Sequence, residues 1–167
     1  MRDNVAEVFA AVERMKAEGV VKEYALGGAM ALIFWSEPVA TFDLDVFVLL
    51  ESSGMLVSLA PIYEWAARHG YAERAEHIII AGVPVQVIPA HNDLAVEAIE
   101  TAVELDYDGQ TVRVIKLEYL IAMYLEPSAR SQKRLERVSG LLDEDEVDHE
   151  LLNALIQRYK LHLPKPR

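Results

Sequence analysis

The sequence feature that most constrains what this chain can fold into is a pair of aspartates at the start of an apolar strand, shortly after a glycine pair. The segment from Tyr24 to Leu50 reads YALGGAMALIFWSEPVATFDLDVFVLL. Its apolar opening ends in Gly27-Gly28, a helix-like segment follows, and the strand-like run then carries Asp43 and Asp45. Because alternate residues of a strand share one face, the sequence predicts that the two aspartates stand side by side.

This arrangement predicts a site for a metal ion and a phosphate group. Two ionised carboxylates on one face repel each other and are costly to desolvate, and a divalent cation between Asp43 and Asp45 removes both costs. Backbone amides at a glycine pair before a helix point outward and suit an anion, so Gly27 and Gly28 are candidate phosphate ligands. An anion site so close to a cation site suggests a nucleoside triphosphate.

Composition narrows the class of protein. The chain has 167 residues, which predicts one domain, and 52% of them are apolar, which is ample for a core. A net charge of −11 argues against a general nucleic-acid coat protein. The sequence has no cysteine, so disulfides and thiolate zinc sites are excluded. The first residues lack a secretory pattern and no apolar run reaches membrane-spanning length, so we expect a cytoplasmic protein without membrane contact.

Hydrophobic periodicity and turn residues predict an α+β fold, with a small mixed sheet covered by helices and a C-terminal helical bundle. The dipeptides Ala81-Gly82 and Asp108-Gly109 predict two hairpins. We place a core at 1–115 and a helical region at 116–167, packed as one unit. The expected helices cover 4–19, 29–35, 55–69, 91–101, 116–126, 129–142 and 148–161, and the expected strands cover 24–26, 42–50, 78–80, 83–88, 103–107 and 111–115.

The Gly-Gly turn followed by Thr41-Phe42-Asp43-Leu44-Asp45 resembles the nucleotidyltransferase superfamily, and most closely its bacterial abortive-infection, type IV toxin–antitoxin group. The resemblance runs from about Tyr24 to Leu161. It implies that Asp43 and Asp45 are catalytic and hold two magnesium or manganese ions against a triphosphate, while a third carboxylate completes the site. The implied reaction is an in-line displacement that releases pyrophosphate.

The chain departs from this pattern at four positions: Gln86, Tyr124, Val39 in place of a frequent arginine, and Lys133-Arg134 in place of a common Lys-Asp pair. Gln86 stands where the resemblance implies the third carboxylate, and an amide binds a hard cation weakly and cannot act as a base. Tyr124 stands where relatives often have a lysine. Glu104 or Asp106 is one hypothesis for a replacement acid. These departures indicate a degenerate site, whereas the intact aspartate pair favours an active one.

Phosphate neutralisation must come from elsewhere in the chain, because no lysine or arginine occurs between Lys22 and Arg68. The best donors are Arg130, Lys133, Arg134 and Arg137, whose spacing puts four cations on one helical face. Among them, Arg130 and Lys133 are candidate phosphate ligands, together with Thr41. A solvated basic surface is the alternative interpretation of the helix, and a turn cap is the alternative role for Thr41.

Two functional hypotheses remain. The first is a metal-dependent nucleotidyltransferase that moves a nucleoside monophosphate from a triphosphate to an RNA, a protein or a small molecule. The second is an inactive protein of the same fold that binds nucleotide, RNA or a partner protein, for example as a toxin–antitoxin component. The apolar stripe of the last helix is explained equally by intramolecular packing and by a homodimer.

Overall fold

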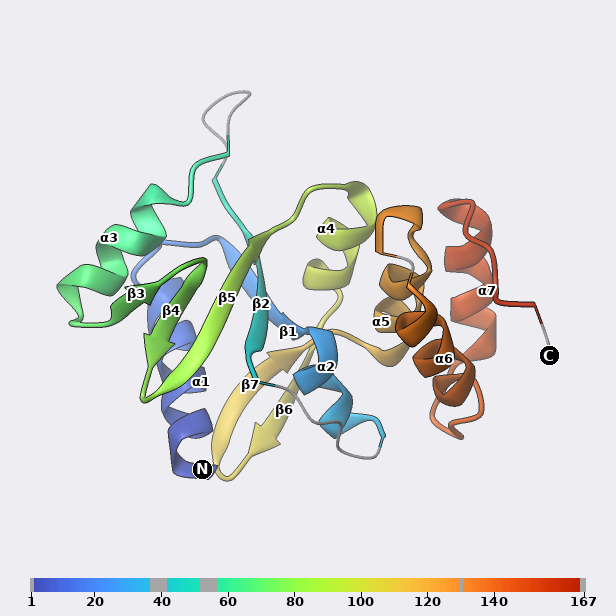
Figure 1. The fold of residues 1–167 in the computed structure, drawn as a ribbon, viewed down its shortest axis with the longest axis horizontal. Helices are drawn as coiled ribbons and strands as arrows, with labels where there is room; N and C mark the ends of the chain where they lie inside the picture. The colour runs from blue at the N-terminus through green and yellow to red at the C-terminus, as the bar shows by residue number, and fades with distance from the viewer. Residues whose placement is uncertain (1, 37–41, 52–56, 130, 166–167) are drawn as a thin grey trace.

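A computed structural model describes residues 2–36, 42–51, 57–129 and 131–165 of the chain. These residues form a mixed seven-stranded sheet with helices on both faces (Figure 1). The sheet order is β3-β4-β5-β2-β1-β7-β6, with β2 parallel to β5 and β1 parallel to β7. The strands are β1 Glu23–Gly27, β2 Leu44–Leu49, β3 Ala72–Arg74, β4 His77–Ile80, β5 Val83–Pro89, β6 Val103–Tyr107 and β7 Gln110–Val114.

Residue pairing between the central strands β1 and β2 defines the two faces of the sheet. Tyr24 lies opposite Val48, and its hydroxyl reaches Glu13 of helix α1, so this face is covered by α1. Asp45 lies opposite Gly27 and therefore points to the other face. The helices are α1 Arg2–Ala17, α2 Gly28–Ala31, α3 Ala60–Arg68, α4 Asp93–Glu100, α5 Leu117–Leu125, α6 Gln132–Leu141 and α7 His149–Arg158.

Helix α5 is the centre of the C-terminal helical region. It contacts α4, α6 and α7, and eight of its nine residues are buried, which explains why it is apolar all round. The one acidic residue among them, Glu118, accepts a 2.7 Å hydrogen bond from the backbone N–H of Asp148. Asp148 in turn caps α7 by accepting from the N–H of Leu151. The loop before α7 is therefore attached to α5 by a satisfied buried carboxylate.

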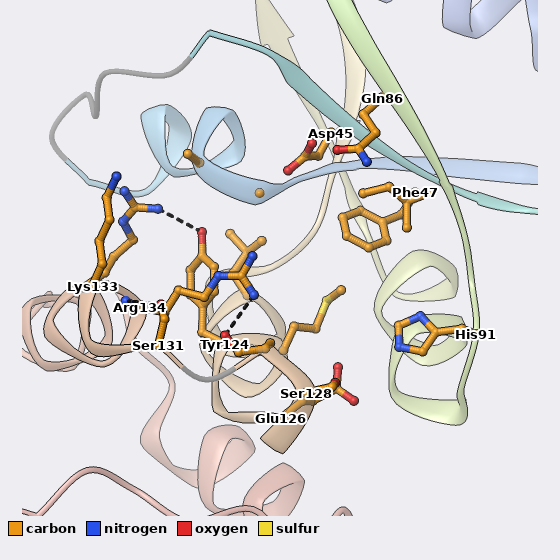
Figure 2. A pocket seen from close by; sticks show the side chains of 17 residues that line it. Asp45, Phe47, Gln86, His91, Tyr124, Glu126, Ser128, Ser131, Lys133 and Arg134 are labelled. Carbon is orange, nitrogen blue, oxygen red and sulfur yellow. Dashed lines mark hydrogen bonds between the residues drawn. The ribbon is translucent and has the colours of Figure 1, made fainter. Parts of the chain in front are cut away.

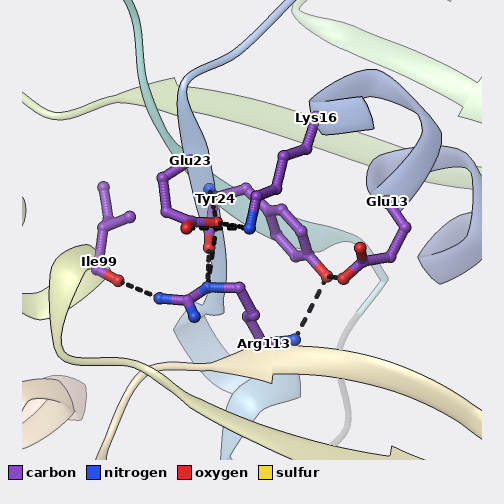
Figure 3. A network of polar contacts seen from close by, with 6 residues as sticks. All are labelled: Glu13, Lys16, Glu23, Tyr24, Ile99 and Arg113. Carbon is purple, nitrogen blue, oxygen red and sulfur yellow. Dashed lines mark hydrogen bonds and ion pairs between the residues drawn. The ribbon is translucent and has the colours of Figure 1, made fainter. Parts of the chain in front are cut away.

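A polar network ties α1 to the sheet and to α4 (Figure 3). Arg113 of β7 donates to the carbonyl of Tyr24 at 3.1 Å and to the carbonyl of Ile99 at 2.9 Å, and it pairs with Glu23 at 3.1 Å. The phenol of Tyr24 is 1% exposed and donates to Glu13, and burial raises its pKa. One arginine thus joins two strands and the end of a helix that are far apart in the sequence.

The predicted α+β class and both hairpins are confirmed, and the predicted elements follow one another in the expected order. Positive φ values at Ala81 and Gly82, and at Asp108 and Gly109, fit the two-residue hairpin turns. The predicted N-cap of α4 is also confirmed, because the Asn92 side chain accepts from the N–H of Ala95.

Several predicted boundaries are wrong. The helix expected over 29–35 is a single α-turn followed by a 3-10 turn over Leu32–Phe34. The helix expected from 55 begins at Ala60 instead, where Pro61 suits the first turn, and the start of that prediction lies outside the described residues. Strand β3, which is exposed along its whole length, was not predicted, since it shows no apolar alternation.

Candidate functional site

A pocket of about 570 Å³ lies between the sheet face that carries Asp45 and the helices α5 and α6 (Figure 2). This volume is typical of small-molecule sites. Asp45 and Gln86 form its sheet side, and Tyr124, Lys133 and Arg134 form its helical side. The full lining is Gly28, Ala29, Asp45, Phe47, Gln86, Ile88, His91, Leu120, Met123, Tyr124, Glu126, Ser128, Ala129, Ser131, Lys133, Arg134 and Arg137.

One row of paired residues crosses the sheet at the pocket. Gly27 of β1 lies opposite Asp45 of β2, Asp45 lies opposite Gln86 of β5, and Gln86 lies opposite His77 of β4. Paired residues share a face, so Asp45, Gln86 and His77 point to the same side of the sheet. The sheet therefore presents a carboxylate, an amide and an imidazole in succession.

The glycine pair makes room for the side chains of β2. A Cβ at Gly28 would lie 2.1 Å from Oδ2 of Asp45, and Gly28 has a φ of +61°, so both space and backbone conformation favour glycine there. A Cβ at Gly27 would lie 2.5 Å from the ring of Phe47. The bend at Gly28 thus brings backbone against the Asp45 carboxylate, which is the juxtaposition that a joint phosphate and metal site requires.

Asp43 lies just before β2 and contacts His77. The distance from Nε2 of His77 to Oδ2 of Asp43 is 3.2 Å, and the two side chains are 21% and 36% exposed. Asp43 is not among the residues that line the pocket. A protein group therefore holds one of the two aspartates, while Asp45 faces the pocket.

Asp45 has the electrostatics of an acid placed for a cation. Burial raises its pKa first, and the neighbouring Asp43 raises it further, while Arg134 and His77 oppose the shift. Without a cation, the folded protein therefore favours the protonated form of Asp45 more than water does. A bound divalent cation would reverse that preference.

Three cations of α6 face this acid across the pocket: Lys133, Arg134 and Arg137. The predicted basic face of the helix is thus part of the pocket wall. The side chain of Ser131 begins α6 by accepting from the N–H of Arg134, which fixes the helix start beside the pocket.

One end of the pocket lies beside a contact between the start of α4 and the end of α5. Asn92 donates through Nδ2 to Oε2 of Glu126 at 2.6 Å, and its Oδ1 caps α4. His91 and Glu126 both line the pocket here. This end carries an acid and an imidazole, in contrast to the basic wall of α6.

The donor set fits one divalent cation better than two. Carboxylate and amide oxygens are suitable ligands for Mg²⁺. Asp45 and Gln86 are on one face of adjacent strands, and Asp43 lies just before β2. Within 2–36, 42–51, 57–129 and 131–165, however, no group of three or more His, Asp or Glu side chains is arranged to hold a metal. The hypothesis that Glu104 or Asp106 supplies a third acid is wrong, because β6 is separated from β2 by both β1 and β7.

The structure brings together several of the predicted site residues. Gly28, Asp45 and Lys133 line one pocket, Gly27 pairs with Asp45 in the sheet, and Asp43 contacts His77. Thr41 and Arg130 lie outside the described residues. Sequence reasoning missed His77, although the Ala81-Gly82 hairpin register pairs it with Gln86 and could have placed it there.

The overall fold is nucleotidyltransferase-like, because solved structures of such proteins align with most of this chain. An antigenic nucleotidyltransferase-like protein from Paracoccidioides brasiliensis aligns with a TM-score of 0.55 at 13% identity, covering 95% of this chain and 89% of that one. The antibiotic-resistance factor ANT(2'')-Ia in solution aligns with a TM-score of 0.54 at 18% identity, covering 96% and 95%.

A crystal structure of ANT(2'')-Ia in complex with adenylyl-2''-tobramycin gives a TM-score of 0.52 at 18% identity, covering 92% of this chain and 98% of that one. No protein-family model matches the sequence, and no curated protein matches it. None of the helices in the described residues has the length and apolarity to cross a bilayer. The shared feature is therefore the fold.

Proposed function

We propose that this protein is a metal-dependent nucleotidyltransferase that moves a nucleoside monophosphate from a nucleoside triphosphate to an RNA, protein or small-molecule acceptor. Asp43 and Asp45 would hold Mg²⁺ or Mn²⁺. Gly27, Gly28, Thr41, Arg130 and Lys133 would contact the phosphates. The metal, when bound, would neutralise charge on the reacting phosphate.

One observation carries the proposal: Asp45, placed against the backbone at Gly28, faces the cations of α6 across a single pocket. A carboxylate that needs a cation and a basic wall that needs an anion are both satisfied by a metal–triphosphate. The structures of nucleotidyltransferase-like fold support the same class of ligand. One of them is in complex with adenylyl-2''-tobramycin, which carries an adenylyl group.

In the proposed reaction, an acceptor hydroxyl oxygen forms a bond to the α-phosphorus. The bond from that phosphorus to the oxygen bridging to the β-phosphate breaks, and pyrophosphate leaves with that electron pair. Gln86 cannot accept the hydroxyl proton, which passes to solvent. The chain contributes positioning and charge neutralisation, and we expect slow transfer because no carboxylate stands at Gln86.

A second candidate is a protein of this fold that binds nucleotide, RNA or a partner protein without chemistry, for example as a toxin–antitoxin component. The amide of Gln86 beside Asp45, and the contact of Asp43 with His77, favour this reading. It differs from the first proposal in predicting ligand binding without release of pyrophosphate.

The deciding experiment incubates the purified protein with labelled nucleoside triphosphates and Mg²⁺ or Mn²⁺. Total RNA, a protein extract and a metabolite extract serve as separate acceptors. Label transfer that disappears in Asp45→Asn and persists in Asp145→Asn, an exposed loop control, supports the enzyme. Binding of the labelled nucleotide without transfer of its label to an acceptor supports the second candidate. Absence of both binding and transfer contradicts the two together.

A further inference from the structure

Two arginines of α6 lie over the ring of Tyr124. The guanidinium carbons of Arg134 and Arg137 each lie 5.9 Å from the centre of that ring. Arg137 also donates to the Tyr124 hydroxyl at 3.5 Å, and Arg134 donates to the carbonyl of Ala129 at 2.9 Å. Figure 2 shows the ring and both hydrogen bonds on the helical side of the pocket. Stacking on an aromatic ring restrains guanidinium groups that would otherwise move freely.

Each of these arginines keeps donors for a ligand. A guanidinium group has five N–H donors in a fixed fork, and the bonds to Ala129 and Tyr124 use few of them. Both side chains line the pocket, so the remaining donors are accessible to its contents. The fork geometry matches phosphate oxygens, which accept two parallel bonds from one guanidinium.

The opposite wall lacks negative charge for a second metal ion. Asp45 is ionisable, but Gln86 beside it is neutral. In the two-metal arrangement that the resemblance implies, three carboxylates hold two cations. With Gln86 in place of the third carboxylate, a phosphate chain in this pocket would contact one cation fewer. The guanidinium pair stands across the same pocket and can supply equivalent charge.

We infer that Arg134 and Arg137, positioned by Tyr124, bind the phosphate chain of a nucleoside triphosphate in place of a second metal ion, so that one divalent cation per chain suffices. This inference rests on the proposed nucleotide site and deepens it. It assigns a phosphate-binding role to Tyr124 and its two arginines, and it predicts the metal stoichiometry.

The first test counts bound metal. The full chain is titrated with Mn²⁺ in the presence of a non-hydrolysable ATP analogue, and bound Mn²⁺ is measured by electron paramagnetic resonance. We expect one Mn²⁺ per chain. In Gln86→Asp we expect a second Mn²⁺, whereas Gln157→Asp, which adds the same charge on the exposed face of α7, should keep one. Two ions in the unchanged protein would overturn the inference.

The second test measures affinity for the same analogue by calorimetry. Arg134→Gln and Arg137→Gln are each expected to weaken binding about tenfold, the size of one lost charged hydrogen bond. Arg137→Lys should recover part of the loss, because charge returns without the fork. Arg68→Gln on the exposed end of α3 is the matched control and should bind as the unchanged protein does.

These outcomes separate the inference from the proposed function. If the analogue binds with Mn²⁺ but neither arginine variant weakens it, the guanidinium role is wrong and the nucleotide site stands. If the unchanged protein binds no analogue with or without Mn²⁺, both are wrong. Circular dichroism of each variant checks folding, so that a loss of affinity reports on the pocket.

Discussion

Gln86 lies directly opposite Asp45 in the parallel ladder between β5 and β2. The resemblance to nucleotidyltransferases implies a carboxylate at this point, and the register shows that the amide occupies the neighbouring position on the same face. The difference between an amide and a carboxylate here decides how many cations Asp43, Asp45 and the residue at position 86 can hold. A substitution at Gln86 therefore tests the effect of metal on binding and on folding stability.

Replacing Gln86 with glutamate adds one negative charge and leaves the size of the side chain almost unchanged. Without metal, we expect Gln86→Glu to destabilise the fold by about 1–3 kcal/mol, because a carboxylate is added beside the half-buried Asp45. Mg²⁺ should recover most of this loss. Urea unfolding with EDTA and with Mg²⁺ measures both, and Gln157→Glu is the exposed control. Equal stability in EDTA would show that the two positions do not interact.

The raised pKa of Asp45 predicts a pH dependence of stability. Because burial and Asp43 favour the protonated form in the folded state, the favourable contribution of Asp45 is present below the ordinary aspartate pKa. It is lost as the pH rises through the raised folded value. Asp45→Asn removes this loss, so in EDTA we expect the variant to gain stability relative to the unchanged protein over the pH range above the ordinary aspartate pKa of 3.8. Urea unfolding of both proteins across this range tests the sign, and parallel curves would contradict it.

Gly28→Ala should cost more than backbone strain alone. An alanine at a positive φ costs about 1–2 kcal/mol. At Gly28 the new Cβ would also meet Oδ2 of Asp45 at 2.1 Å. Gly109→Ala is a matched control, since Gly109 has a positive φ of 82° and no atom within 4 Å of the added Cβ. Thermal unfolding should show a larger loss for Gly28→Ala than for Gly109→Ala, and equal losses would place the Asp45 carboxylate elsewhere.

We expect the loss of the Arg113 side chain to weaken the attachment of α4 to strands β1 and β7 (Figure 3). Arg113→Lys keeps the charge but cannot donate at once to the Tyr24 carbonyl, the Ile99 carbonyl and Glu23. We expect a loss of about 2–3 kcal/mol in the free energy of unfolding, measured in urea. Arg74→Lys on the exposed strand β3 should change stability by less than about 0.5 kcal/mol.

Local patterns in the sequence determined most of the helices and strands, and they identified Asp43 and Asp45 as the candidate acidic site. Glycine dipeptides set the hairpins, period-2 and period-3.6 apolar patterns set the strands and helices, and the spacing of Asp43 and Asp45 indicated a cation site. These features follow from backbone sterics and from burial over a few neighbouring residues.

Only the tertiary structure decided which side chains face Asp43 and Asp45. The sheet order puts two strands, β1 and β7, between β2 and the strand that carries Glu104 and Asp106, and it puts His77 against Asp43. The packing of α6 on α5 brings Arg134 and Arg137 around Tyr124 and across the pocket from Asp45. Such neighbours depend on strand order and helix packing, which join residues far apart in the chain, and a local sequence pattern does not encode them.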